Sequence, residues 1–169
     1  MKKIIIIGCP GSGKSTLAVK LKEKLNVPVL HLDSIYHIDN AMHITREQLT
    51  TRVAAFAGAS DSWIIDGNYI STLEQRIMLA DTIIWLNIDT SICLANVIAR
   101  TRQPRGVDMA AGFDNTRLDD EFLQKIKDFN ANTMPKMQNL YKKYKACKQF
   151  IILNSYQQIE NFLQNIKEN

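Results

Sequence analysis

Residues 8–15 constrain the fold of this chain more strongly than any other part of its sequence. They read GCPGSGKS and follow directly on the apolar run IIII. This is the G-x-x-x-x-G-K-S pattern of a phosphate-binding loop, placed as it must be between a strand and a helix. Its glycines let backbone N–H groups turn toward phosphate oxygens, and the positive end of the next helix strengthens the attraction. The motif therefore predicts a nucleotide-binding α/β domain.

Two side chains of this loop have expected roles toward the phosphates and the metal. Lys14 is expected to reach the β- and γ-phosphates of ATP, and the Ser15 hydroxyl is expected to coordinate Mg²⁺. A glycine-rich turn that binds nothing is the alternative, which the flanking strand and helix disfavour. The residues expected to bind the nucleotide are Gly8, Gly11, Ser12, Gly13, Lys14, Ser15, Thr16 and, later in the chain, Arg100.

Short apolar runs rich in β-branched residues alternate with segments of helical period along the chain. This alternation is typical of parallel strands joined by crossover helices, and continuous apolar runs indicate a sheet covered on both faces. We expect one domain over residues 1–169. Strands are predicted at residues 3–7, 29–32, 63–65, 82–87 and 150–153.

Several helices have recognisable starts. Three candidate capping boxes precede helical segments, each with a hydroxyl residue followed three positions later by Glu or Gln. They are Thr45 with Gln48, Ser71 with Glu74, and Ser155 with Gln158. Residues 119–145 follow a helical period that Pro135 interrupts, so a kinked or broken helix is expected there.

Residues 103–118 contain proline, glycine and charge without a periodic pattern, and we predict a mobile lid there. Four arginines bracket this segment: Arg100, Arg102, Arg105 and Arg117. Guanidinium groups suit the oxygens of a migrating phosphoryl group. A surface role stays open for any one of them, but four arginines around one loop argue against a surface role for all. Arg100 and Arg105 are the expected catalytic residues, because Arg100 should project from the end of a helix and Arg105 lies early in the flexible segment.

Three predicted strands are followed by an aspartate: Asp33, Asp66 and Asp89. Ligands of doubly wound sheets gather at the carboxyl ends of the strands. If the third strand adjoins the first, Asp66 is the metal-side carboxylate, and Asp33, one strand further out, faces the phosphate acceptor. Asp89 is more simply a helix cap, and a cap or turn role stays open for the other two.

The acceptor side has further candidates near Asp33. Tyr36 and His37 follow it closely and are expected to line the acceptor pocket, and Arg76 is placed to reach the acceptor. A solvated surface role for Arg76 stays open. A zinc site of His31, His37 and His43 is disfavoured, because their spacings match no zinc-binding pattern.

Together these motifs resemble those of one family. The segments GCPGSGKST, HLDSIYH, WIIDGNY, RIMLADTIIWLNID and residues 100–117 are similar to those of the DNA topology modulation proteins, a branch of the adenylate kinase-like P-loop kinases. The resemblance covers nearly the whole chain in the same order. It implies a three-layer P-loop NTPase fold with a five-stranded parallel sheet in the order 2-3-1-4-5, helices on both faces and a small lid. It also implies transfer of the ATP γ-phosphate to a small acceptor.

The sequence departs from adenylate kinases at two places. Adenylate kinases continue the Asp-Gly of the third strand with Phe-Pro-Arg, whereas this chain has Asn68 and Tyr69, which argues against AMP as the acceptor. They also carry an arginine one helical turn before the position of Arg100, where this chain has Asn96. A stacking contact to adenine is therefore not expected from that position.

Composition bounds the setting of the protein. The net charge of +4 suits phosphate-rich ligands but is also common without an anionic partner. Cys9, Cys93 and Cys147 lack framework spacing, which favours reduced thiols in the cytoplasm. Packing is the favoured role of Cys9, with a reactive thiol of lowered pKa as the alternative. No apolar run is long enough for a signal peptide or a membrane span.

Two functions follow from these observations. The first is an ATP- and Mg²⁺-dependent kinase for a nucleotide, nucleoside or other small acceptor, with Lys14 and the lid arginines acting on the phosphates. The second is a nucleotide-dependent protein that binds DNA or modulates its topology and hydrolyses ATP. Direct nucleic-acid binding is disfavoured, because the lysines of residues 136–148 lack aromatic interleaving or a recognition motif and suit a solvated helix face.

Overall fold

The computed structural model describes residues 1–38, 42–100 and 120–166. All five predicted strands are present, and no end differs from its expected bound by more than one residue. They are β1 (Lys3–Gly8), β2 (Val29–His31), β3 (Trp63–Asp66), β4 (Thr82–Leu86) and β5 (Gln149–Leu153). They form one sheet in the order β2-β3-β1-β4-β5, with every neighbouring pair parallel. The predicted strand order is confirmed.

The register of the sheet brings the ends of three strands to one edge. Asp66 pairs with Ile6 of β1 and with His31 of β2, and Gly8 pairs with Leu86 of β4. Since parallel strands end at the same edge, the residues that follow β1, β2 and β3 meet there. This edge carries the phosphate-binding loop.

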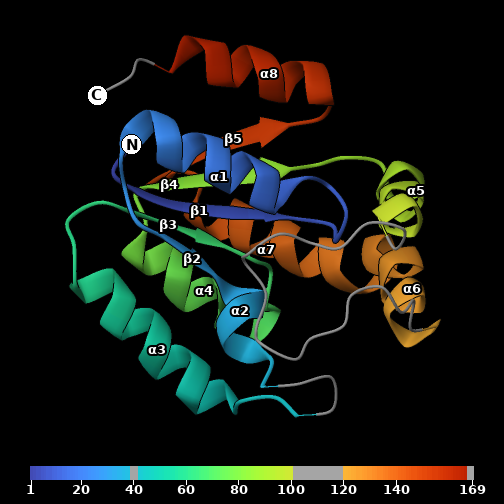
Figure 1. The fold of residues 1–169 in the computed structure, drawn as a ribbon, viewed down its shortest axis with the longest axis horizontal. Coiled ribbons are helices and arrows are strands. Elements are labelled where there is room, and N and C mark those ends of the chain that lie inside the picture. The colour runs from blue at the N-terminus through green and yellow to red at the C-terminus, as the bar shows by residue number, and fades with distance from the viewer. Residues whose placement is uncertain (39–41, 101–119, 167–169) are drawn as a thin grey trace.

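Helices cover both faces of the sheet (Figure 1). α1 and α8 contact each other on one face, whereas α4 packs between α3 and α7 on the other. The short helix α2 lies beyond the end of β2, and α5 packs on α6. The bounds are α1 (Lys14–Leu25), α2 (Leu32–Tyr36), α3 (Arg46–Gly58), α4 (Ile70–Leu79), α5 (Thr90–Arg100), α6 (Asp120–Lys127), α7 (Met134–Tyr144) and α8 (Tyr156–Asn165).

β1 forms the centre of the core. Its four isoleucines, Ile4 to Ile7, are between 0% and 2% exposed because helices cover both faces. Burying an isoleucine side chain completely stabilises a fold by about 1.5–3 kcal/mol. The run that marks β1 in the sequence is therefore also what fixes the start of the phosphate-binding loop rigidly against the sheet.

The predicted capping boxes have three different outcomes. Thr45 and Gln48 form the reciprocal pair at the start of α3, as expected. Ser155 Oγ accepts from the Gln158 N–H, but the Gln158 side chain accepts from the N–H of Asn154 and not of Ser155. The third box, Ser71 with Glu74, is wrong.

Helix α4 begins one residue before Ser71, so Ser71 lies inside the helix and cannot cap it. Tyr69, in a left-handed conformation, occupies the N-cap position. The Glu74 side chain accepts instead from Lys143 and from the Tyr144 hydroxyl of α7.

The helical segment before β5 is broken, as predicted, but the break precedes the proline. A π-helical turn, η1 (Phe129–Thr133), separates α6 from α7. Pro135 lies in the first turn of α7, where its missing N–H would have no helical partner. The predicted lid, residues 103–118, lies outside the described residues.

Candidate functional site

Residues 8–15 adopt the expected loop between β1 and α1. Gly8, Gly11 and Gly13 have φ angles of 151°, 87° and 93°, which side chains rarely tolerate. At Gly11 a Cβ atom would also lie 2.2 Å from the Cys93 carbonyl oxygen of α5. Glycine is therefore required at position 11 on two counts, and α5 lies directly against the loop.

The loop presents a cation and a helix start toward the same edge. α1 begins at Lys14, immediately after the left-handed Gly13. Lys14 Nζ donates to the Cys9 carbonyl oxygen at 3.1 Å, so its side chain folds back over the loop. Ser12 is fully buried, and its Oγ has no hydrogen-bond partner among the described residues. The side chain of Thr16, also in the first turn of α1, is exposed.

A buried carboxylate faces the loop from the end of β3. Asp66 is 4% exposed, and its Oδ2 accepts from the Ser15 hydroxyl at 2.7 Å. His31 Nδ1, at the end of β2, lies 3.0 Å from the same oxygen. The structure thus brings together Ser15 and Asp66, which the sequence assigned to the metal.

The surroundings of Asp66 keep it ionised. Burial opposes the charged form, but the hydrogen bond with His31, the charge of Lys14 and the hydrogen bond from Ser15 outweigh it. The pKa of Asp66 therefore lies below its ordinary value. An anionic carboxylate beside a phosphate-binding loop is suited to hold a divalent cation.

The donor set fits Mg²⁺ as P-loop proteins bind it. Mg²⁺ takes one or two protein oxygens and completes its shell with phosphate oxygens and water. The buried Oδ1 of Asp66 has no hydrogen-bond partner among the described residues, which leaves an oxygen available beside the Ser15 hydroxyl. No group of three or more His, Cys, Asp or Glu in that part of the chain could hold a metal ion by itself, so a metal here would depend on the phosphates.

Asp33 and Tyr36 lie together, but not at the end of a strand. The predicted strand over residues 29–32 stops at His31, and Asp33 lies in α2. Its Oδ1 accepts from the Tyr69 hydroxyl at 2.7 Å, and the rings of Tyr36 and Tyr69 have centroids 4.6 Å apart. Burial, together with the Asp33 charge, raises the pKa of Tyr69, which keeps its hydroxyl protonated as a donor.

Arg76 does not occupy the predicted acceptor-binding position. Its side chain is 0% exposed and lies under the turn that joins β3 to α4. The guanidinium donates to the carbonyl oxygens of Gly67 at 2.7 Å and Tyr69 at 3.2 Å, and also to that of Asn68. Because these bonds direct the charge at the backbone, the Arg76 guanidinium holds the turn in place. Burial lowers its pKa to about 9.

The described arginine of the lid group, Arg100, lies at the end of α5. Its side chain is exposed, and its Nε donates to the Asn96 carbonyl oxygen. Arg102, Arg105 and Arg117 lie outside the described residues. Asn96, one turn before Arg100, donates to the Gly11 carbonyl oxygen at 3.0 Å and to the Tyr156 hydroxyl. Asn96, at the position where adenylate kinases carry arginine, therefore links the phosphate-binding loop to α5 and α8.

The remaining polar candidates have structural partners. Asp89 caps α5 as expected, with Oδ1 accepting from the Ser91 N–H at 2.8 Å. His37 and His43 pair through a β-bridge, and their ring centroids are 4.7 Å apart. Lys148 donates to the carbonyl oxygens of Met78 and Ala80 at the end of α4, so it caps that helix.

Cys9 is not an activated thiol. Cys9 and Cys93 are buried, and Cys147 is exposed. A hydrogen bond with Cys93, together with burial, raises the pKa of Cys9. The alternative of a Cys9 thiol with lowered pKa is therefore wrong, and packing is its role.

Sequence reasoning missed the parts of Asn68, Tyr69 and His31 in this site. The Asn68 amide contacts both backbone groups of Gly8, and Tyr69 and His31 contact the two aspartates. Asn68 and Tyr69 stood out in the sequence as a departure from adenylate kinases. That departure was the available signal that this turn has its own contacts.

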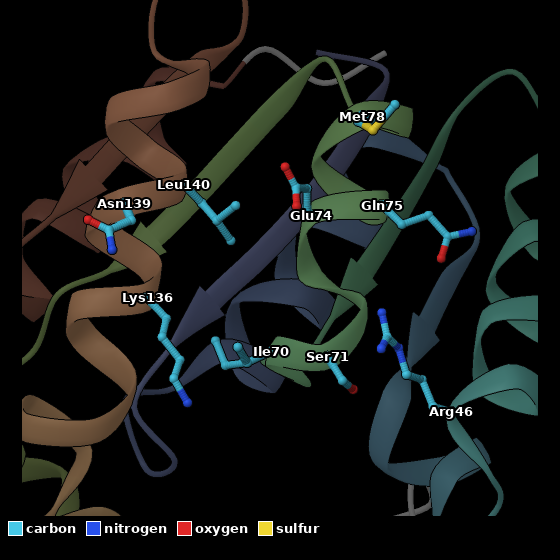
Figure 2. A pocket seen from close by; sticks show the side chains of 9 residues that line it. All are labelled: Arg46, Ile70, Ser71, Glu74, Gln75, Met78, Lys136, Asn139 and Leu140. Atoms are coloured by element: carbon cyan, nitrogen blue, oxygen red, sulfur yellow. The ribbon is translucent and has the colours of Figure 1, made fainter.

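A separate pocket of about 670 Å³ lies on the outer face of α4 (Figure 2). It contains none of the loop residues, and its charged side chains come from α3, α4 and α7. Glu74 in this pocket is already paired with Lys143. The lining residues are Arg46, Ile70, Ser71, Glu74, Gln75, Met78, Lys136, Asn139 and Leu140. The glycine loop at the sheet edge therefore lies outside this pocket.

Comparisons with solved structures identify the fold. Shikimate kinase from Acinetobacter baumannii in complex with shikimate superposes with a TM-score of 0.62 at 15% identity, covering 98% of this chain and 90% of that one. Deoxyadenosine kinase from M. mycoides gives a TM-score of 0.53 at 14% identity, covering 95% and 96%. This chain has a P-loop kinase fold.

Sequence comparisons reach less far. The family model of the chromatin associated protein KTI12 matches residues 1–55, which include the phosphate-binding loop but neither Asp66 nor the later helices. No curated protein matches the chain. None of the described helices is both long and apolar enough to cross a membrane.

Proposed function

We propose that this protein is an ATP- and Mg²⁺-dependent phosphotransferase that acts on a small-molecule acceptor. The observation that carries the proposal is the contact between the Ser15 hydroxyl and the buried, ionised Asp66 at the mouth of the glycine loop. A glycine turn without a ligand has no need of a carboxylate with an unpartnered oxygen at that place. The kinase folds of the two neighbouring structures support the same class of reaction.

The loop residues bind and orient the phosphates of ATP. Backbone N–H groups of the loop after Gly8, together with the start of α1, would surround the phosphate oxygens. When ATP binds, Lys14 would donate to a phosphate oxygen in place of the Cys9 carbonyl oxygen. The new hydrogen bond is stronger because its acceptor is an anion. Ser15 and Asp66 would hold Mg²⁺, which neutralises phosphate charge when bound.

Asp33 acts on the acceptor. Its carboxylate lies on α2, and one of its oxygens accepts a hydrogen bond from the Tyr69 hydroxyl, which holds the side chain in place. The other oxygen can take the proton of a hydroxyl group on the substrate that receives the phosphate. Tyr36 lines the same place. Arg100 and Arg105 stabilise the charge on the transferred phosphoryl group.

The acceptor is proposed to carry a hydroxyl group. Shikimate and deoxyadenosine, named for the two neighbouring structures, are both small molecules with hydroxyls. Release of ADP that depends on an added acceptor, screened over nucleosides, nucleotides and small polyols, identifies the class. ADP release at one rate with every compound would contradict transfer to an acceptor.

The first prediction concerns Lys14. Lys14→Ala is expected to leave the unfolding free energy nearly unchanged, because the side chain bonds only the loop, and to weaken ATP binding at least tenfold. Affinity is measured by titration with a fluorescent ATP analogue. The matched control is Lys22→Ala, an exposed lysine of the same helix, which should bind as the wild type does. Unchanged affinity in Lys14→Ala would place the nucleotide elsewhere.

A nucleotide-dependent nucleic-acid-binding protein is the second candidate. It is favoured by the match of residues 1–55 to the chromatin associated protein KTI12 and by the net charge of +4. Such binding should weaken steeply with salt, because phosphate contacts release counterions. Duplex DNA that competes for the protein at low salt, with no acceptor-dependent ADP release, would favour this candidate.

A further inference from the structure

The turn between β3 and α4, residues 67–69, contacts the first residue of the phosphate-binding loop through one side chain. Asn68 Oδ1 accepts from the Gly8 N–H at 2.9 Å, and Asn68 Nδ2 donates to the Gly8 carbonyl oxygen at 2.5 Å. The amide thus satisfies both backbone groups of Gly8. Sixty residues separate the two in sequence, so this contact is tertiary and not a local turn.

The turn is itself held in a fixed and strained shape. Gly67 has φ 137°, and Tyr69 has φ 31°, which an aromatic residue adopts only when its surroundings enforce it. The buried guanidinium of Arg76 supplies that enforcement, since it bonds the carbonyl oxygens of all three turn residues. Asn68 therefore presents its amide from a braced backbone.

The same turn also contacts the acceptor side. Tyr69, the residue after Asn68, donates its hydroxyl to Asp33. Two adjacent residues of one braced turn thus reach the two places where the proposed reaction needs fixed geometry. A misplacement of about 1 Å between reacting groups can cost on the order of a hundredfold in rate, so an element that contacts both has a functional consequence.

We propose that Asn68 is a positioning residue that fixes Gly8, and with it the phosphate-binding loop, in the conformation that accepts a nucleotide. The inference rests on the proposed nucleotide binding at this loop and assigns a role to a residue that touches no phosphate itself. Arg76 acts behind Asn68, and Tyr69 carries the same restraint to Asp33. The loop is in this way positioned by side-chain contacts from β3–α4 as well as by its own glycines.

The amide chemistry makes the test specific. Asn68→Ala removes both bonds to Gly8. Asn68→Asp preserves the size of the side chain and can still accept from the Gly8 N–H, but its carboxylate faces the Gly8 carbonyl oxygen and repels the phosphates. If Asn68 only filled space, Asn68→Leu, which keeps the size of the side chain and adds no charge, would bind ATP as the wild type does. If Asn68 positions Gly8, Asn68→Leu binds ATP as weakly as Asn68→Ala does, and the aspartate binds it more weakly still because its charge repels the phosphates.

The experiment titrates each protein with N-methylanthraniloyl-ATP, with Mg²⁺ and with EDTA. We expect Kd to rise about tenfold in Asn68→Ala and further in Asn68→Asp, in both conditions, because the defect lies in the loop and not in the metal site. Amide exchange at Gly8, followed by NMR, should be faster in Asn68→Ala, since the Gly8 N–H loses its acceptor. Asn161→Ala, on the exposed part of α8, is the control for loss of an asparagine.

The outcomes separate this inference from the function on which it rests. Wild-type protein that binds no analogue overturns the proposed function. The positioning role alone is overturned by a different result. In that result the wild-type and Lys22→Ala proteins bind the analogue, Lys14→Ala does not, and the Asn68 variants bind it with the wild-type Kd. If Asn68→Ala does not fold, Asn68→Leu still decides, because it conserves the size of the side chain without adding charge. A wild-type Kd in this variant contradicts the proposal, and a raised Kd with a wild-type unfolding midpoint supports it.

Discussion

At the scale of single residues, the two aspartates beyond β2 and β3 have different surroundings and should behave differently. Asp66 is buried and contacts Ser15 and His31, whereas Asp33 lies on α2 beside Tyr69. Both carboxylates end up near the same edge of the sheet. Their partners, and not their position in the sequence, divide the metal side from the acceptor side.

We predict that Asp66→Asn weakens Mg²⁺-dependent ATP binding more than Asp33→Asn does. Losing the charge of Asp66 acts on the nearer cation, and we expect a loss of at least tenfold in apparent Mg²⁺ affinity. Asp33→Asn should instead lower transfer to the acceptor while ATP affinity is retained. A magnesium titration monitored by analogue fluorescence measures the first effect, and the reverse order of the two variants would exchange their roles.

The sequence singled out Lys14 and Ser15 from the loop pattern and Asp66 from its place after a strand, and the structure brings Ser15 and Asp66 into contact. The sequence did not identify Asn68, since an asparagine after Asp-Gly is equally suited to an ordinary turn. It placed Arg76 wrongly for a similar reason. Arginine is mostly a surface or ligand-binding residue, and only the tertiary structure shows three carbonyl oxygens converging on a buried guanidinium.

At the scale of elements, the starts of α3 and α4 show when a capping pattern is decisive. Both sequences offer a hydroxyl residue followed three positions later by Glu or Gln. At α3, Thr45 caps the helix through its reciprocal pair with Gln48. At α4 the braced turn of residues 67–69 already determines where the helix begins, so the pattern at Ser71 has no part in it.

We predict that Thr45→Ala lowers the unfolding free energy by about 1 kcal/mol through loss of the cap. Ser71→Ala, at an exposed helical position, should change it by less than about 0.5 kcal/mol, and in the stabilising direction if at all, because alanine is the better helix former. Urea unfolding of the two variants measures the difference. Equal losses at both positions would mean that Ser71 also caps its helix.

At the scale of the whole molecule, the strand alternation predicted the α/β class correctly from period and β-branched runs alone. The order of the strands required the family resemblance as well, because each run is apolar throughout and would suit several positions in a covered sheet. A break at Pro135 was foreseen, but the structure breaks the helix before the proline, at a π-helical turn that no pattern in the sequence indicated.

Acid should destabilise the whole fold. Burial disfavours ionised Asp81, but hydrogen bonds from Thr82 and from the N–H groups of Lys3 and Lys2 outweigh it and hold its pKa below the ordinary value. A carboxyl whose pKa is lower in the folded protein than in the unfolded chain stabilises the fold at pH values above its unfolded-state pKa, which is near 3.9. That stabilisation is lost as the pH falls through the folded-state pKa.

We therefore predict that Asp81→Ala costs about 1 kcal/mol at pH 7 and that its difference from the wild type shrinks below about pH 4. Asp81 is largely exposed, so the estimate is that of its hydrogen bonds and not of its charge. Urea unfolding at pH 7, 5 and 3 measures the difference, with the exposed Asp61→Ala as the matched control. If the difference in unfolding free energy between Asp81→Ala and the wild type stays constant with pH, the effect of Asp81 comes from packing and not from its ionised carboxylate.

The contacts that complete the phosphate-binding loop have a consequence for the order in which the chain can fold. Ser15 and Gly8 are made early on the ribosome, yet their partners Asp66 and Asn68 follow 51 and 60 residues later. The central strand β1 likewise has no neighbouring strand to pair with until β3 and β4 have been synthesised. The entropy of closing a long stretch of chain must be lost before such contacts can stabilise the fold. The phosphate-binding loop, the most recognisable segment of the sequence, is therefore among the last to reach its final conformation. A nucleotide can therefore stabilise the finished protein by binding, but it cannot act as a template for the first third of the chain.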